Sequence, residues 1–430
     1  MESNSESDIY ACLPQYSPSH PSPCYSLYPA CDETRLDLTP HAGTRPLPTD
    51  VFTKAYGSAT VVLLDQEPNA QVPTYGRQGS VRGTLILKED TLNVSEIVVK
   101  LEGRLDITTT DAGAMSIKAF KDTHTLWPPN SESSSMCPTT IDFSCLFPAA
   151  FRHTGQEYPL PPSYIARFAG FPALFAKITY SLIILIKVRR LGFMSKTKCI
   201  YVVLDYNPRM SPPRGISLTQ SFLAEVKAMP EEWHQFLFNM KTRSSSTLAP
   251  IQGQMFIPSV RVFGLSDTIP LHVQLSGPVS SLRELIPPPT QNHDAATTVN
   301  YFNSLHLKPA VRVYMNRMVS FEYRGKLVWR VSRIGEGRAL PLPPVMDYDC
   351  DFRDTNACGR CDSHVEDLDW RAEVKCNPDV TVGGFSVIGL VVKDFIVLEL
   401  APPNPISSPL MTVQHAVPIR LVTESFVPPS

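Results

Sequence analysis

The stretch KITYSLIILIKVRR, residues 177–190, alternates between two sets of side chains. The residues between Thr179 and Lys187 at odd positions are mixed in polarity, whereas the even positions are wholly apolar: Ile178, Tyr180, Leu182, Ile184, Ile186 and Val188. A buried helical turn over SLIILI is the alternative. The period of two and the β-branched residues favour a strand with one buried face.

Other segments repeat this pattern. In VSEIVVKLEGRLDIT, residues 94–108, Ile97, Val99 and Leu101 share one face and charged residues occupy the other, as in a strand with one solvated face. Further short apolar runs read as strands: 59–66, 80–90, 199–206, 253–264, 269–277, 310–323, 383–400 and 417–426. The 41 prolines and 21 glycines disfavour helices, so the sequence predicts an all-β protein.

The length of 430 residues is large for one core and suggests two or three units. The proline-rich break NPRMSPPRG, residues 207–215, is the first credible boundary. We predict four parts: a disordered tail rich in Ser, Pro and Tyr at 1–50, a β unit at 51–208, a linker with a short helix at 209–249 and a β unit at 250–426.

The predicted short helix lies in MPEEWHQFLFNM, residues 229–240. Pro230 and two acidic residues precede the apolar residues Trp233, Phe236, Leu237 and Met240, which are spaced as on one helix face.

The composition also limits the partners and the compartment. The chain has 39 Lys and Arg residues against 41 Asp and Glu, so it lacks the excess of positive charge that is typical of nucleic-acid-binding proteins. The N-terminus lacks a signal-peptide pattern, and no apolar run approaches the ~20 residues of a membrane span. Ten cysteines without such a signal indicate reduced thiols. We therefore expect a cytoplasmic protein without a transmembrane segment.

No motif of catalysis is present: there is no nucleophile elbow, zinc-protease motif, P-loop or dinucleotide fingerprint. We expect no enzyme activity and no cofactor. One metal hypothesis is open. Cys350, Cys358, Cys361 and Cys376 lie in an acidic stretch at 347–376, but the second pair lacks the spacing of a zinc knuckle. We favour an acidic loop with reduced thiols over a zinc site.

Several phrases, taken in order, resemble the arrestin family, and within it fungal α-arrestin-like proteins. They are V-x-G-x-L-x-L at 81–87 followed by IVVKLEGRLD, then YPLPPSY followed by the 177–190 strand, then the closing pair at 389–400 and 417–426. The segments FLAEVKAMPEEW and FIPSVRVFGLSDTIPLHVQL also look like those of the fungal chains. The resemblance covers residues 51–426.

This resemblance implies a fold of two antiparallel immunoglobulin-like β-sandwiches in tandem. It implies a non-enzymatic adaptor in protein trafficking and endocytosis, peripheral to plasma membrane or endosomes. Such a protein would bind cytoplasmic tails of membrane proteins and recruit a HECT-type ubiquitin ligase through its WW domains. The alternatives are a sorting scaffold like a retromer subunit, and a zinc-binding regulator.

One departure from the family concerns a buried charge cluster. Visual and β-arrestins hold an inactive state with an arginine in the strand before the interdomain hinge, whereas CIYVVLDY at 199–206 carries only Asp205. We therefore do not expect a phosphate-sensing cluster of that type.

Two tetrapeptides match ligands of WW domains. Pro161, Pro162 and Tyr164 form a PPxY pattern, but the resemblance places this stretch inside the first β unit, where it is structural.

Leu13, Pro14 and Tyr16 form the LPxY variant in the tail, where an extended peptide can enter a WW groove without unfolding the protein. The alternative is chance occurrence in a Ser/Pro/Tyr-rich segment. We prefer Tyr16 as the candidate ligand.

Overall fold

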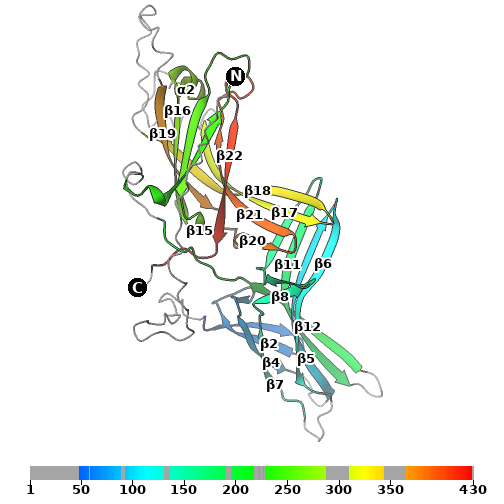
Figure 1. Ribbon diagram of the computed structural model, residues 1–430. Coiled ribbons are helices and arrows are strands. Elements are labelled where there is room, and N and C mark those ends of the chain that lie inside the picture. Colours follow the sequence, from blue (N-terminus) through cyan, green and yellow to red (C-terminus); the bar gives the residue numbers. More distant parts are fainter. Residues whose placement is uncertain are drawn as a thin grey trace, which may run out of the picture. The chain divides into compact units, whose positions relative to one another are not determined.

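The computed structural model describes residues 48–428 apart from 58, 89–92, 130–135, 190–194, 217–221, 223–225, 227, 287–308 and 343–364. The regular secondary structure of the described residues is almost entirely β-strand, which confirms the all-β prediction (Figure 1). Residues 46–428 form one compact unit, so the domain boundaries at 208 and 250 stay predictions.

Strands of the first half form two larger sheets and a small one. The four-stranded sheet has the order β1 (Asp50–Tyr56), β2 (Ala59–Gln66), β4 (Ser80–Leu87) and β7 (Thr140–Leu146). The six-stranded sheet has the order β3 (Thr74–Tyr75), β12 (Ser195–Tyr206), β11 (Leu174–Arg189), β5 (Val94–Thr109) and β6 (Gly113–Trp127), with β10 (Tyr164–Phe168) also paired to β11. A two-stranded sheet joins β8 (Ala150–His153) and β9 (Gln156–Pro159).

The two larger sheets share a hydrophobic core. The alternation predicted for β5 and β11 is confirmed, because Ile97, Val99 and Leu101 are fully buried together with the even-numbered side chains of β11 from 174 to 186. Phe147, Tyr180 and Tyr206 form an aromatic group with ring centroids 5.0 to 5.5 Å apart. Burial of these apolar surfaces is the main force that holds the sheets together.

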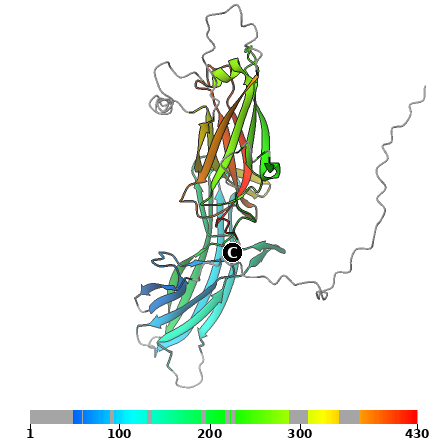
Figure 2. The same ribbon diagram turned by 90° about the vertical axis from the view of Figure 1, so that its left-hand side faces the viewer.

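Strands of the second half form one ten-stranded sheet. Its order is β13 (Trp233–Met240), β14 (Ile251–Pro258), β16 (Thr268–Pro278), β19 (Val365–Cys376), β18 (Lys326–Pro341), β17 (Val311–Tyr323), β21 (Leu390–Leu400), β22 (Val413–Val422) and β15 (Val262–Gly264), with β20 (Phe385–Val387) on β21. The sheet curls over its own apolar face, since Met255 of β14 and Val417 of β22 belong to one buried cluster (Figure 2).

The ends of several C-terminal strands pack into the first core. Val319 and Phe321 of β17, Val328 of β18 and Val392 of β21 are buried in the same cluster as β5 and β11. The two groups of sheets therefore share apolar side chains within the compact unit.

The helix predicted at 229–240 is wrong. Only Pro230–Glu232 form a short 3-10 turn, and strand β13 follows directly. Phe236, Phe238 and Met240 point inward while Leu237 is 71% exposed, a period of two. Pairing with β14 decides this outcome, because Phe238 lies over Gly253, where a side-chain carbon would collide with its ring. Tertiary pairing overrides the helical spacing.

The acidic loop predicted at 347–376 is wrong for its second half, because residues 365–376 form strand β19. Leu368, Trp370, Ala372 and Val374 are buried and alternate with charged residues. The same period of two is present in the sequence VEDLDWRAEVKC, residues 365–376. The many acidic residues of this stretch led to the prediction of a loop instead.

The structure describes both ends of one α-helix, α2 (Val279–Leu285). The sequence analysis did not predict this helix. Leu282 and Leu285 anchor it in the second core. In the part of the chain that the structure describes, no helix is long and apolar enough to cross a membrane.

Candidate functional site

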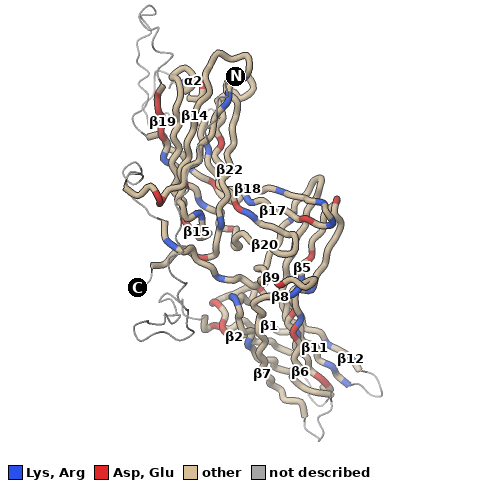
Figure 3. The backbone as a smooth tube through the Cα atoms, in the orientation of Figure 1, with Lys and Arg blue, Asp and Glu red and all other residues tan. Residues whose placement is uncertain are grey.

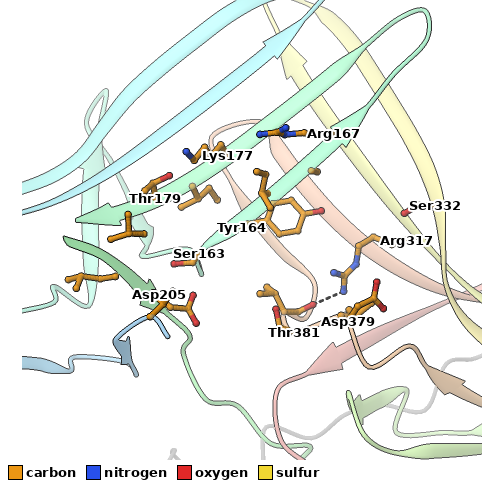
Figure 4. Close-up of a pocket in the computed structure, with 18 of the residues that line it drawn as sticks. Ser163, Tyr164, Arg167, Lys177, Thr179, Asp205, Arg317, Ser332, Asp379 and Thr381 are labelled. Atoms are coloured by element: carbon orange, nitrogen blue, oxygen red, sulfur yellow. Dashed lines mark hydrogen bonds between the residues drawn. The ribbon is translucent and has the colours of Figure 1, made fainter. Parts of the chain in front are cut away.

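An open pocket of about 800 Å³ lies along strand β10, beside the end of β12 and the loop at 379–382 (Figure 4). Its volume is in the range of ligand pockets. Tyr164 lies near the centre of Figure 4. Arg167 and Lys177 lie above it, Arg317 lies to its lower right and Asp205 to its lower left.

Strand β10 has one edge that no other described strand occupies. It pairs antiparallel with β11, from Tyr164 opposite Ile178 to Phe168 opposite Leu174, and all five of its residues line the pocket. A free strand edge presents unpaired N–H and C=O groups, which an extended peptide can pair with by strand addition. The pocket thus combines a cavity with main-chain hydrogen-bonding capacity.

Exposed apolar side chains line the same pocket. Ile165 is 54% exposed, Tyr201 is 48% exposed and Val203 is 47% exposed. Clustered exposed apolar surface of this kind marks a binding site more often than an inert surface. A partner that covered these side chains would gain free energy from burying them.

A buried ion pair closes one side of the pocket. Arg317 of β17 lies directly opposite Asp394 of β21, and the guanidinium makes two bonds to the carboxylate, 2.7 Å from Nε to Oδ1 and 3.1 Å from Nη2 to Oδ2. The side chains are 7% and 0% exposed. Arg317 Nη2 also donates to the carbonyl oxygen of Val382 at 2.7 Å, which fixes the 379–382 loop at the pocket.

The electrostatics of this pair reflect its burial. Burial raises the pKa of the Asp394 carboxyl above its ordinary value, although the adjacent Arg317 guanidinium lowers it. Removing water from a carboxylate is costly unless a cation and hydrogen bonds replace that water. Arg317 supplies both, so the two side chains depend on each other.

The sequence analysis missed this pair. Both residues are single charges on the inward face of an apolar strand, in VYMNRMVSF and in VVKDFIVL, and that position was the available signal. Their pairing across 77 positions of sequence depends on strand register, which the sequence does not display.

Asp205 is the charged residue of strand β12 that lines the pocket, and the strand carries no arginine. Burial raises the pKa of Asp205, and a hydrogen bond with Ser163 partly offsets this effect. The buried arginine near the pocket comes from β17 and pairs with its own cross-strand neighbour. The expectation that this protein lacks a phosphate-sensing cluster of the visual-arrestin type stays a prediction.

The PPxY segment forms the entry to β10. Pro161 and Pro162 are buried, and Tyr164 is half-buried with its ring edge on Phe385 at 5.2 Å between centroids. The Tyr180 hydroxyl donates to the Pro161 carbonyl oxygen at 2.5 Å. Burial raises the pKa of Tyr164 to about 12, which the nearby Arg317 partly offsets. A WW domain would have to pull these side chains out of their contacts before it could bind them.

Two basic side chains flank the mouth of the pocket. Arg167 and Lys177 are exposed, and neither makes an ion pair with a carboxylate in the described part of the chain. The Arg167 guanidinium lies 5.4 Å from the centre of the Phe175 ring. Unpaired cations beside an open cavity favour a partner with acidic groups.

The candidate zinc ligands are only partly visible. Cys350, Cys358 and Cys361 lie outside the described residues. Cys376 ends β19 in the core, where its thiol donates to the Ile334 carbonyl oxygen at 3.3 Å, and burial raises its pKa to about 11. Among the described residues no group of three or more His, Cys, Asp and Glu side chains is placed to hold a metal ion.

The remaining candidate ligand, Leu13, Pro14 and Tyr16, also lies outside the described residues. No protein-family model matches this chain, and no curated protein sequence matches it. The candidate site therefore depends on the geometry of the pocket alone.

Proposed function

We propose that this protein is a non-enzymatic, arrestin-like adaptor that binds an extended segment of a partner protein in the pocket along β10. The observation that carries the proposal is the free edge of β10 on an open cavity, between exposed apolar side chains and unpaired cations. Strand addition supplies affinity through the main chain, and the neighbouring side chains supply selectivity.

The partner class follows from the arrestin resemblance together with this chemistry. An unstructured cytoplasmic tail of a membrane protein can adopt an extended form in the pocket, and acidic residues in it would lie near Arg167 and Lys177. Recruitment of a WW-domain ubiquitin ligase through the N-terminal tail is the second half of the proposal. It would connect the bound cargo to endocytosis.

A photo-crosslinking amino acid in place of Ile165 tests the pocket. Because Ile165 is exposed and lines the cavity, we expect crosslinks in the source cell to cytoplasmic tails of membrane proteins. The same amino acid in place of Leu237, which is exposed on β13 away from the pocket lining, is the matched control. The readout is mass spectrometry of the crosslinked partners, and the same set from both positions would contradict the proposal.

A pull-down with isolated WW domains tests the ligase connection. We expect the full chain to bind and Tyr16→Ala to abolish binding, because the tyrosine ring fills the WW groove. Tyr25→Ala, a second tyrosine of the same tail without the LPxY pattern, should leave binding unchanged. If the unsubstituted chain fails to bind any WW domain, the retromer-like scaffold becomes the better description.

A further inference from the structure

Hydrogen bonds at both ends of β11 show which edge of the strand each of its residues faces. Just before the strand, the Ala173 carbonyl oxygen accepts from the Thr110 N–H at 3.3 Å, and the Ala173 N–H donates to Thr110 Oγ1 at 3.0 Å, both on the β5 side. At the far end the Lys187 carbonyl oxygen accepts from Ser95 Oγ of β5 at 3.1 Å. Because main-chain groups alternate between the two edges of a strand, odd-numbered residues of β11 bond toward β5 and even-numbered residues toward β10 and β12.

The same alternation assigns the main-chain groups of β10. Tyr164, Ala166 and Phe168 lie opposite even-numbered residues of β11, so their N–H and C=O groups are used in that pairing. The N–H and C=O groups of Ile165 and Arg167 therefore point to the other edge, which no described strand occupies. An added strand would form its hydrogen bonds with these two residues.

The last residue of β12 marks where this free edge ends. The Ser163 N–H, two positions before Ile165, donates to the Tyr206 carbonyl oxygen at 2.8 Å, and the Tyr206 N–H donates to Ser163 Oγ at 2.8 Å. Tyr206 thus occupies the edge beside Ser163, as the alternation requires. The open positions of the edge begin at Ile165.

The two open positions differ in chemistry. Ile165 and Arg167 are exposed and share the outer face of the sheet with their cross-strand partners, Lys177 and Phe175. Lys177 lies one strand further in, opposite Asp106 of β5, a strand on which acidic and basic residues are mixed (Figure 3). Arg167 is therefore the cation at the free edge itself, and Ile165 is the apolar side chain beside it.

We infer that the partner segment pairs antiparallel with β10 and places an acidic side chain opposite Arg167 and an apolar side chain opposite Ile165. From its N-terminus to its C-terminus the segment then reads acidic residue, any residue, apolar residue, because directly opposite side chains share one face of a sheet. The inference rests on the proposed function, since it assigns a sequence class to the segment bound at the same edge.

Two observations support this direction and this order of charge. All pairs of the six-stranded sheet apart from β3 with β12 are antiparallel, and antiparallel ladders are slightly more stable per residue. The carboxyl group of Asp205, which makes a hydrogen bond with Ser163, lies at the Ile165 end of the edge. An acidic residue of the partner is therefore favoured at the Arg167 end and disfavoured at the other.

Selection from a phage library of random short peptides, with the purified full chain as the target, tests the sequence class. We expect the enriched peptides to share an acidic and an apolar residue in that order, separated by one position. In a synthetic peptide of the enriched sequence, N-methylation of either residue removes an N–H that bonds to β10 and should weaken binding about tenfold. N-methylation of the residue between them should have little effect, because its N–H points away from β10.

Substitutions on β10 test the register. Ile165→Pro removes an N–H on the free edge, so the midpoint of thermal unfolding should be nearly unchanged while peptide binding weakens about tenfold. Ala166→Pro removes an N–H that bonds to β11 and should lower the midpoint by several degrees. Ile165→Val keeps the N–H and an apolar side chain and should bind like the unsubstituted chain.

A charge reversal tests the acidic position. Selection against Arg167→Glu should enrich a basic residue where the unsubstituted chain selects an acidic one. Lys196→Glu changes an exposed residue of β12 outside the pocket lining and should select the same acidic peptides as the unsubstituted chain.

The outcomes separate this inference from the adaptor proposal. The inference is wrong if no peptide is selected, if the enriched order is apolar before acidic, or if Ile165→Pro binds the peptide as tightly as the unsubstituted chain. Crosslinks from position 165 to tails of membrane proteins would leave the adaptor proposal standing in each of these cases. A dimer in sedimentation velocity that Ile165→Pro converts to a monomer would show that a second copy occupies the edge, which also overturns the inference.

Discussion

Replacing Arg317 with alanine should lower the free energy of unfolding by about 3–5 kcal/mol, as expected when one partner of a buried ion pair is removed. The substitution leaves the Asp394 carboxylate fully buried without its cation and releases the Val382 carbonyl oxygen. Chemical denaturation followed by tryptophan fluorescence measures the change.

Two comparisons separate burial from charge. Arg82→Ala breaks an ion pair of the same 2.7 Å length, but its side chains are 53% and 31% exposed, so the loss should be about 0–1 kcal/mol. The double variant Arg317→Met with Asp394→Leu removes both charges and should recover most of the stability. Equal losses from Arg317→Ala and Arg82→Ala would show that the buried pair is not important for stability.

The pH dependence of Arg317→Ala has a defined sign. In the variant the only influence that lowered the pKa of Asp394 is gone, so the folded-state pKa lies further above the unfolded value. The folded state then binds more protons than the unfolded state, and stability falls as pH rises from the unfolded pKa through the folded one. The variant should therefore be less destabilised in acid than at neutral pH.

Tyr180→Ala should cost about 3–5 kcal/mol, the usual range for deleting a large aromatic side chain from a core. Tyr180 has no exposed surface and contacts the rings of Phe120, Phe147 and Tyr206. Its hydroxyl also holds the Pro161 carbonyl oxygen. The loss should appear in chemical denaturation together with faster proteolysis near residues 158–164.

Tyr180→Phe isolates the hydroxyl. It keeps the ring contacts but leaves the Pro161 carbonyl oxygen without this donor, so the loss should be about 1–3 kcal/mol. A loss from Tyr180→Phe as large as that from Tyr180→Ala would mean that ring packing contributes little. A negligible loss would mean that water replaces the hydroxyl as the donor.

These contacts change the meaning of the PPxY match. A four-residue pattern describes the order of residues but not their exposure, and here the two prolines are buried and Tyr164 packs on Phe385. The LPxY pattern of Leu13, Pro14 and Tyr16 in the N-terminal tail lies outside the described residues, so it stays a predicted ligand of WW domains. The WW pull-down is therefore directed at Tyr16.

Local alternation was sufficient to predict strands where one face is apolar over many residues. β5 and β11 are the clearest cases, because a period of two is set by strand geometry and needs no knowledge of the partner strand. β13 and β19 show the limit of that reasoning. In β13 the exposed Leu237 completed an apolar spacing that is typical of a helix. In β19 the acidic residues of the exposed face outweighed the alternating apolar residues of the buried face, so a loop was predicted.

The all-β class could be predicted from the sequence, because side-chain periodicity is a local property that each strand carries. The candidate site depends on the tertiary structure, because strand register places Arg317 beside Asp394 and leaves one edge of β10 without a partner among the described strands. The tertiary structure also decided which apolar side chains remain outside, as Trp329 and Phe171 show. Burial depends on what packs against a residue, and that is a property of the whole folded chain.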